Sequence, residues 1–315
     1  MRPPSAPFYP TSPLVVAPPA AVFNPQGEMS WSSPHGTPLP DWRSRTVVMA
    51  IMNLTPDSFS DGGAIMSPDS ALRRAELLLN EGAEVLDLGA ESTRPGAMPV
   101  DAATELSRLL PVIAALRRRF PAAVLSVDTY KAEVARATVA AGADLVNDVE
   151  GGRFGARGME SPMASACAAL RCPLILMHRR PAAAYTDFWS EVTDDLRTSI
   201  RRALAAGLPA EQIWTDPGFG FGKTPAQNLA LVRNLERISA LGFPVMLGAS
   251  RKSTLGAVLQ ETDPLQREPG NIAAMVWGVS RGCSMIRTHA VAEIQPYLRM
   301  AEAMRRGQNW QAEES

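Results

Sequence analysis

The segment Gln212 to Thr224, which reads QIWTDPGFGFGKT, places a carboxylate between a short apolar run and a glycine-rich loop. Proline and glycine after Asp216 turn the chain, and a tight turn alone would explain them. The loop is not a Walker phosphate-binding loop, because Gly218 stands one residue too close to the Gly-Lys-Thr sequence. Asp216 beside Phe219 and Phe221 indicates instead a site for a flat, nitrogen-rich ring held by a buried carboxylate.

Polar or charged residues also follow the other short apolar runs of the chain. In chain order, the polar residues at the ends of the runs are Asn53, Asp87, Asp128, Asn147 with Asp148, His178, Asp216, Ser250 to Lys252, and Arg287 with His289. One or two buried carboxylates would be explained as structural hydrogen-bond partners. A polar group at the end of every run indicates a common functional site.

The first set within this site consists mainly of hydrogen-bond acceptors. Asp128, Asn147 and Asp216 offer carboxylates and an amide, and Lys252 adds one cation. An unpaired carboxylate deep in a protein is costly. We therefore expect a ligand with several N–H donors and a carbonyl, such as the edge of an aminopyrimidinone.

The second set is cationic and comprises Arg94, Arg287 and His289, with Asn53 alongside. Arginine forks suit phosphate oxygens, and an amide oxygen can join phosphate in holding Mg²⁺. Taken alone, Arg94 fits an ordinary surface arginine equally well, and His178 is better explained as an ordinary core histidine. Together the two sets predict a pocket for a flat heterocycle joined to a phosphorylated arm.

The elements that must position these residues repeat from residue 46 onward. Short apolar runs alternate with amphipathic helical patterns, which is typical of parallel strands with helices between them. For example, Ser67 predicts the start of a helix over residues 70–80. Eight units over residues 46–305 predict a (β/α)8 TIM barrel, with a doubly wound sheet as the alternative. The predicted strands are Val47–Met52, Glu84–Leu88, Ala123–Val127, Asp144–Val146, Pro173–Met177, Gln212–Thr215, Pro244–Leu247 and Cys283–Ile286.

Composition limits the partners and the compartment. The net charge of -1 over 315 residues gives no electrostatic case for binding nucleic acid or an anionic membrane. The three cysteines lack CxxC spacing, which favours a reducing cytoplasm over a disulfide framework or a zinc site. No apolar run approaches the roughly 18 residues of a spanning helix. We expect a cytoplasmic protein that binds small molecules.

The N-terminal segment differs in composition from the rest. Eleven of the 27 prolines fall within the first 40 residues, which carry few charges. Such a segment has little to drive packing. We predict a disordered, dispensable Pro-rich tail over residues 1–45, a barrel over 46–307 and a C-terminal tail over 308–315.

At these motifs the chain resembles the dihydropteroate synthase family. The matching stretches are MAIMNLTPDSFSDGG (49–63), GAEVLDLGAESTRPG (82–96), SVDTYK (126–131), NDV (147–149), LMH (176–178), DPGFGFGK (216–223), GASRKS (248–253) and IRTH (286–289). The resemblance implies a (β/α)8 barrel, usually dimeric, that condenses 6-hydroxymethyl-7,8-dihydropterin diphosphate with p-aminobenzoate in folate biosynthesis. The products would be 7,8-dihydropteroate and pyrophosphate, with Mg²⁺ required. Pyrophosphate would leave first, and the arylamine would then capture a pterin cation.

The resemblance also implies a role for each site residue. The pterin would contact Asp128, Asn147, Asp216 and Lys252, with Met177 and Gly248 against its faces. Asn53 would bind the metal; Arg94, Arg287 and His289 would bind the diphosphate; and Thr93, Pro95, Phe221 and Ser253 would form the p-aminobenzoate pocket. Lys252, Asp128 and Arg287 are the expected catalytic residues.

Two alternatives stay open at this stage. A barrel that presents methyltetrahydrofolate to a corrinoid would keep the acceptors but would need neither Thr93-Arg94-Pro95 nor the loop from Ser250 to Ser253. A pterin-binding paralogue without turnover is favoured slightly by two departures from the family pattern. These are Ala290, where Asp is common, and a short loop at residues 179–182.

Overall fold

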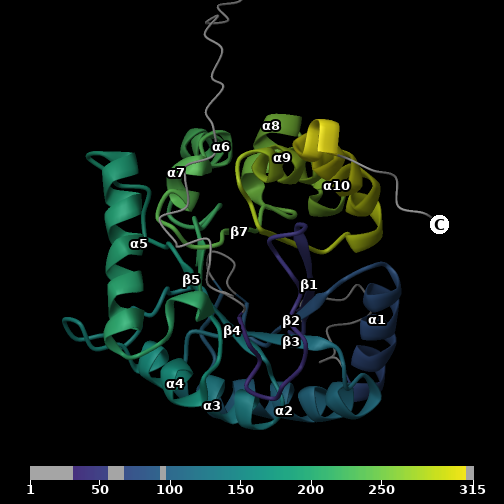
Figure 1. The fold of residues 1–315 in the computed structure, drawn as a ribbon, viewed down its shortest axis with the longest axis vertical. Helices are drawn as coiled ribbons and strands as arrows, with labels where there is room; N and C mark the ends of the chain where they lie inside the picture. The colour runs from purple at the N-terminus through teal and green to yellow at the C-terminus, as the bar shows by residue number, and fades with distance from the viewer. Residues whose placement is uncertain (1–30, 56–66, 93–96, 310–315) are drawn as a thin grey trace, which may run out of the picture.

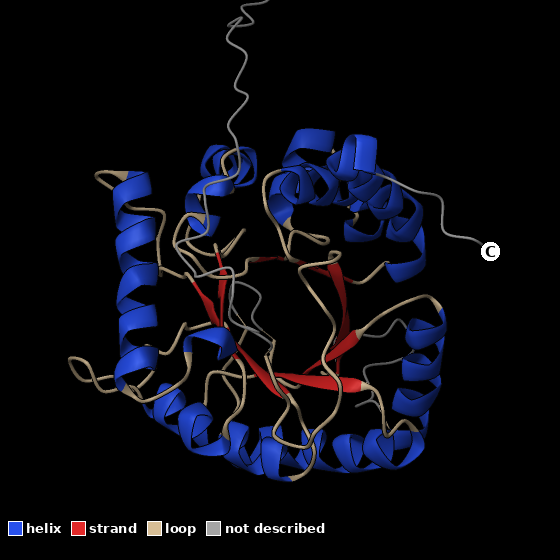
Figure 2. Ribbon diagram, in the orientation of Figure 1, coloured by secondary structure: helices blue, strands red, loops and turns tan. Residues whose placement is uncertain are grey.

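The computed structural model describes residues 31–55, 67–92 and 97–309, and these residues form an eight-stranded barrel surrounded by helices (Figures 1 and 2). This architecture confirms the predicted (β/α)8 barrel and excludes the doubly wound sheet. The strands are β1 Val47–Asn53, β2 Val85–Gly89, β3 Val124–Asp128, β4 Leu145–Asp148, β5 Leu174–Met177, β6 Ile213–Asp216, β7 Met246–Leu247 and β8 Met285–Thr288.

All neighbouring strands are parallel, in the order β6-β5-β4-β3-β2-β1-β8-β7. The ring closes between β6 and β7 through one bridge, Thr215 to Val245. Across this closure the Thr215 N–H donates to the Pro244 carbonyl at 3.0 Å. Since parallel strands point the same way, their carboxyl ends meet at one mouth of the barrel.

Helices cover the outside of the sheet, and their ends carry the expected caps. The Ser67 hydroxyl accepts from the Ser70 N–H, which confirms the predicted start of α1. A reciprocal capping box joins Thr224 and Gln227 at the start of α6. The helices are α1 Pro68–Asn80, α2 Ala102–Arg119, α3 Ala132–Ala140, α4 Pro162–Leu170, α5 Phe188–Ala205, α6 Pro225–Arg233, α7 Glu236–Ser239, α8 Ser253–Leu259, α9 Glu268–Ser280 and α10 Val291–Arg306, with 3-10 turns η2 Ala210–Gln212, η3 Pro264–Arg267 and η4 Gly307–Asn309.

The core has two layers, as expected for this architecture. The larger layer fills the space between strands and helices. The smaller layer fills the barrel interior near the amino ends of the strands, and every strand contributes to it. Its buried residues are Trp31, Val47, Met49, Val85, Val124, Leu145, Ile175, Trp214, Met246 and Met285. The interior is therefore a packed plug at that end and leaves the carboxyl end for polar groups.

Residues 31–44 pack against the barrel, so the predicted tail boundary at residue 45 is too late for this part of the chain. Trp31 is 5% exposed, and its ring centroid lies 4.7 Å from that of Trp214. The Trp42 ring lies 5.7 Å from the same indole. The Ser33 hydroxyl donates to the buried Asp144 carboxylate at 2.6 Å. Trp31 and Trp42 supply apolar area for packing, which the prediction from the proline content did not take into account. Residues 1–30 lie outside the described residues.

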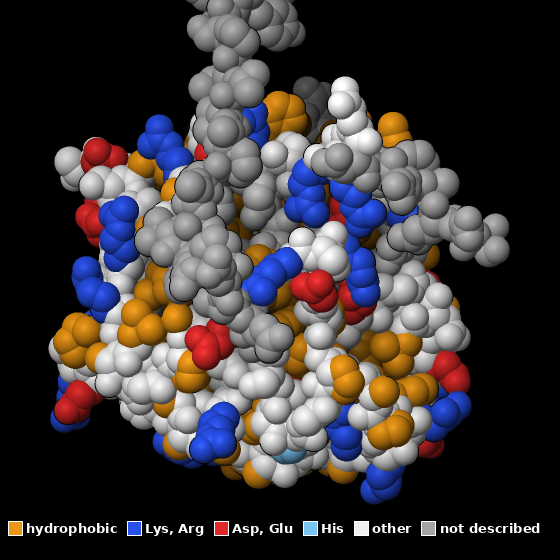
Figure 3. All heavy atoms as spheres, in the orientation of Figure 1, with side chains coloured by type: hydrophobic (Ala, Val, Ile, Leu, Met, Phe, Trp, Pro, Cys, Tyr) orange, Lys and Arg blue, Asp and Glu red, His pale blue; other side chains and the backbone are white. Residues whose placement is uncertain are grey.

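The surface agrees with the small net charge. On the face drawn in Figure 3, basic and acidic side chains are interspersed. Among the described helices, none combines the length and the apolar character that crossing a bilayer requires.

Candidate active site

The alternation of side chains along each strand brings the polar residues into the barrel. Residues two apart on a strand face the same side. Val85, Val124 and Leu145 belong to the interior layer. Asp87 therefore also faces inward, as does Asn147, and so does Asp128, four positions beyond Val124. The same parity connects Trp214 to Asp216, Met246 to Gly248 and Met285 to Arg287.

A network of ion pairs links strands that are not neighbours at the mouth. Arg287 on β8 donates from Nε to Asp87 Oδ2 at 2.6 Å and from Nη2 to Asp128 Oδ2 at 2.8 Å. The Asn147 amide donates to Asp87 Oδ2 at 3.1 Å. Asp87 is fully buried, so its charge is matched inside the protein rather than by solvent. The network therefore connects three of the predicted site residues: Arg287 and Asn147 donate to Asp87, and Arg287 also donates to Asp128.

Asp216 and Lys252 form the other side of the group of polar residues at the barrel mouth. The Asp216 carboxylate accepts from the Gly218 N–H at 2.6 Å. Lys252 donates to the Phe219 carbonyl at 2.6 Å, and its Nζ lies 4.5 Å from the centroid of the Phe221 ring. Phe219 and Phe221, the two aromatic residues of the glycine-rich loop, thus form an aromatic wall in contact with Lys252.

Burial shifts the pKa values of these groups toward their neutral forms. It raises the pKa of the Asp128 carboxyl, and the Arg287 guanidinium opposes that shift. Burial likewise raises the pKa of Asp216, opposed by Lys252. The pKa of Lys252 falls to about 8 because burial outweighs the attraction of Asp216. The mouth therefore carries charged groups that solvent stabilises poorly.

Several buried polar atoms at the mouth have no protein partner. These include Asn147 Oδ1 and Asp87 Oδ1. A buried polar atom normally has a hydrogen-bond partner, so these two oxygens can accept from a donor that the protein itself does not supply.

The remaining predicted residues lie around the same mouth. Met177 ends β5 and is buried. Gly248 directly follows β7, and a Cβ added to this glycine would lie 3.6 Å from the Cβ of Arg287. Ser253 begins α8 and is exposed. His289 Nδ1 lies 3.0 Å from Ser250 Oγ, so this hydroxyl stands beside the histidine where Ala290 offers no carboxylate.

Asn53 reaches the mouth from the end of β1. A Cβ added at Gly89 would lie 3.8 Å from Asn53 Oδ1 and 3.7 Å from Asp128 Oδ2, so both oxygens face the same small volume. Thr93, Arg94 and Pro95 lie outside the described residues.

Two functional candidates were missed or left unassigned from the sequence. Asp87 was recognised at a strand end but was not placed in the ring, although a carboxylate inside the apolar run VLDLG was its signal. Lys223 was not singled out, because its role depends on a contact with His178, which follows the neighbouring strand β5. His178 itself is buried and bonded to Asp195 at 3.1 Å instead of facing the ring.

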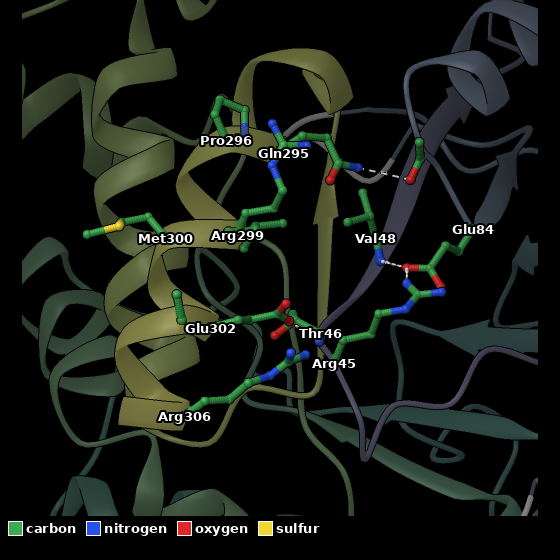
Figure 4. Close-up of a pocket in the computed structure, with 13 residues that line it drawn as sticks. Arg45, Thr46, Val48, Glu84, Gln295, Pro296, Arg299, Met300, Glu302 and Arg306 are labelled. Carbon is green, nitrogen blue, oxygen red and sulfur yellow. Dashed lines mark hydrogen bonds and ion pairs between the residues drawn. The ribbon is translucent and has the colours of Figure 1, made fainter. Parts of the chain in front are cut away.

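A separate cavity of about 620 Å³ lies between α10 and the amino-terminal half of β1 (Figure 4). The Arg45 guanidinium and the Glu84 carboxylate pair there at 2.5 Å. None of the ring residues lines it, so this cavity is distinct from the mouth that carries the polar ring.

An eight-stranded barrel with acceptors and cations converging at the carboxyl ends of its strands has the arrangement of a barrel enzyme, whose active site lies at that end. A model of the pterin-binding enzyme family matches residues 49–289. Dihydropteroate synthase from Bacillus subtilis strain 168 is 42% identical over 263 residues, which cover 84% of this chain and 90% of that protein. The chain therefore belongs to the dihydropteroate synthase family.

Solved structures agree in fold and in sequence. Dihydropteroate synthase from Clostridium difficile, crystallised in the presence of pteroic acid, superposes with a TM-score of 0.80 at 39% identity. That match covers 85% of this chain and all of the other. The enzyme from Xanthomonas albilineans with 4-aminobenzoic acid superposes with a TM-score of 0.78 at 42% identity, covering 83% of this chain and 93% of that chain.

Proposed function

We propose that this protein condenses 6-hydroxymethyl-7,8-dihydropterin diphosphate with p-aminobenzoate, releasing pyrophosphate and forming 7,8-dihydropteroate. The observation that carries the proposal is the convergence of Asp128, Asn147, Asp216 and Lys252 on one barrel mouth. Relatives of similar sequence were crystallised with pteroic acid, 4-aminobenzoic acid and 7,8-dihydropteroate, which together represent one substrate and the product.

The acceptors would bind the pterin ring by its N–H edge. Asn147 Oδ1 is buried and unpaired, and Asp216 uses Oδ1 for the Gly218 N–H, which leaves Oδ2 to accept from the ligand. Lys252 would donate to the ring carbonyl. Met177 and Gly248 would pack against the two faces of the ring, since neither offers a charge to it.

The leaving diphosphate would be held by cations and by a metal ion. Two of the three guanidinium nitrogens of Arg287 donate to carboxylates, and five N–H donors in all leave others for phosphate oxygens. His289 and Arg94 would add to this set. These groups stabilise the charge that develops on the departing oxygen.

The donor set fits Mg²⁺ as the metal. Within the described residues, no three His, Cys, Asp or Glu side chains converge as a metal cage. Mg²⁺ commonly keeps several waters and binds substrate phosphates through one or two protein oxygens, a role that Asn53 Oδ1 can fill. When bound, the ion would neutralise diphosphate charge.

The reaction would exchange one bond for another at the pterin methylene carbon. The carbon–oxygen bond breaks and its electron pair leaves with pyrophosphate. Buried carboxylates such as Asp128 stabilise the positive charge left on the pterin. The arylamine nitrogen then forms the new carbon–nitrogen bond and loses a proton. Thr93, Pro95, Phe221 and Ser253 would line the pocket that holds the arylamine in line with this carbon.

Measurement of both products tests the function. Purified protein with the two substrates and Mg²⁺ should release pyrophosphate and form dihydropteroate in equal amounts. Binding of a pterin without release of pyrophosphate would identify instead a paralogue without turnover. Methyl transfer from methyltetrahydrofolate to a corrinoid would identify the other pterin-binding barrel.

We also propose that the protein is a homodimer in the cytoplasm. The three cysteines, all buried and free, are compatible with a reducing compartment. Large apolar side chains are exposed on α6, α8, η3 and α9, which pack against one another; they are Leu229, Val258, Leu259, Leu265 and Trp277. An exposed apolar area of this kind is typical of an interface. Sedimentation should give twice the chain mass, and Trp277→Glu should give the single-chain mass.

A further inference from the structure

The ammonium group of Lys223 lies inside the loop that follows β6. Its Nζ donates to the carbonyls of Gly218 at 2.9 Å and Phe221 at 3.0 Å, and it lies 2.8 Å from His178 Nδ1. A lysine ammonium has three hydrogens, so these three short contacts use its full donor capacity. The side chain therefore ties both ends of the loop to the end of β5.

The histidine end of this contact has a defined tautomer. The Asp195 carboxylate can only accept, so the hydrogen of the neutral ring lies on Nε2, 3.1 Å from Asp195 Oδ2, and Nδ1 accepts from Lys223. Asp195 on α5 also accepts from Arg180 Nε at 2.8 Å. Burial lowers the pKa of His178 and keeps the ring neutral. A continuous set of contacts thus connects α5, the end of β5 and the loop after β6.

The loop backbone leaves little room for any other arrangement. Gly218 and Gly222 have φ values of +70° and +61°, where side chains are rarely tolerated. A Cβ at Gly218 would lie 1.7 Å from the His178 carbonyl oxygen, and one at Gly222 would lie 2.1 Å from that of Arg180. The backbone of this loop therefore packs directly on the backbone after β5, and the Lys223 side chain adds a contact between the same two segments.

The middle of the loop has an anchor of its own. The Gly220 N–H donates to Asn228 Oδ1 at 2.7 Å, and Asn228 Nδ2 donates to Thr254 Oγ1 at 2.8 Å. The adjacent Phe219 carbonyl accepts from Lys252. Lys223 instead holds the carbonyls on either side, those of Gly218 and Phe221. Loss of the Lys223 contacts would therefore move the Phe221 ring more than the Lys252 ammonium.

We propose that Lys223 is a positioning residue that fixes Phe221 as a wall of the arylamine pocket, acting through the neutral His178 and Asp195. The inference rests on the proposed function and deepens it, because it makes the binding of p-aminobenzoate depend on a residue that need not touch either substrate. A displacement of about 1 Å at such a wall can change rates about 100-fold.

Steady-state kinetics of Lys223→Met test the proposal. We expect the KM for p-aminobenzoate to rise about tenfold or more. The Kd for a pterin, measured by calorimetry, should stay within about threefold of the wild-type value, because Lys252 keeps its own anchor. Arg197→Met, which removes an exposed cation from α5, is the matched control and should leave both constants unchanged. Unchanged constants in Lys223→Met, or equal weakening of both substrates, would overturn the inference.

A pair of histidine variants keeps the test decisive if Lys223→Met does not fold. The side-chain oxygen of His178→Asn can accept near the position of Nδ1, whereas the longer side chain of His178→Gln reaches the position of Nε2 and donates from its amide nitrogen to Asp195, leaving Lys223 without that acceptor. We expect His178→Gln to raise the KM for p-aminobenzoate several-fold more than His178→Asn, and equal values would overturn the inference. Wild-type turnover is measured first: its absence would refute the proposed function and the inference together.

Discussion

Arg287 on β8 and Asp128 on β3 form an ion pair of 2.8 Å across the barrel mouth, although 159 positions separate them in the sequence. The strands that carry them are not neighbours in the sheet, so the pair spans the interior instead of running along its wall. A second carboxylate, Asp87, accepts from the same guanidinium and from Asn147. The groups proposed to bind the substrate are therefore held in place by one another.

Substitution of Asp87 tests how far this network supports the fold. Asp87→Ala leaves Arg287 with one carboxylate fewer and leaves the Asn147 amide without its acceptor. Removing one partner of a buried ion pair typically costs about 3–5 kcal/mol. We expect the free energy of unfolding in urea to fall by about that amount. Asp194→Ala, which removes an exposed carboxylate on α5, is the control; an equal effect of the two substitutions would contradict the assigned network.

Lys252 is expected to be essential for turnover. Lys252→Ala removes the cation that lies between Asp216 and the aromatic wall, and loss of one such donor typically lowers kcat about 100-fold or more. Initial rates of pyrophosphate release measure the effect. Activity within a factor of about two of wild type would show that the lysine is not part of the site.

The depressed pKa of Lys252 predicts how pterin binding depends on pH. Its pKa is about 8 in the folded protein, so the ammonium is charged below that pH and neutral above it. Binding that uses this charge should weaken as pH rises through about 8. Calorimetric titrations with a pterin from pH 6 to 10 should show the loss, and Lys252→Met should remove the part centred near pH 8 while retaining the barrel. Asp128, whose pKa burial raises to about 7, titrates in both proteins.

The same shift has the opposite effect on the stability of the ligand-free protein. The unfolded chain keeps the lysine proton up to a pKa of about 10.5, so it binds more protons than the folded chain between pH 8 and 10.5. The contribution of Lys252 therefore makes the free energy of unfolding rise with pH across that window. Urea denaturation of wild type and Lys252→Met at several pH values measures it: curves of identical slope would contradict the shift.

The N-terminal segment divides into two parts with different expected effects. Deleting residues 1–30 should leave activity and stability intact, because their proline-rich composition with few charges gives little to drive packing. Deleting residues 1–44 also removes Trp31 and Trp42 from the Trp214 indole. Loss of a buried tryptophan typically costs about 3–5 kcal/mol, so the longer deletion should lower the unfolding temperature markedly. Equal melting temperatures for both deletions would show that the packing of residues 31–44 contributes nothing.

The fold was predictable because apolar runs, polar ends and helix caps recur in register along the chain. All eight predicted strands lie within two residues of the observed ones. The ring could be anticipated for the same reason: alternation on parallel strands sends Asp128, Asn147 and Asp216 to one mouth.

Other features depend on distant contacts and left no periodic signal. Trp31 packs on Trp214, and Lys223 binds His178, because the folded barrel brings these residues together. Asp87 is intermediate: its position was visible, but its partner Arg287 lies 200 residues further along the chain. Local sequence identifies where a side chain points, whereas the identity of its neighbour comes only from the closed structure.

The single bridge between Thr215 and Val245 makes the β6–β7 junction the weakest seam of the barrel. Asp216 lies at the β6 side of this junction and Gly248 at the β7 side, so a pterin bound between them would contact both strands and stabilise the junction. Backbone amides along this junction should exchange with deuterated solvent sooner than those of β1 and β2, and should slow most when the ring binds. The β6–β7 junction would then reach its full stability only when the substrate is bound.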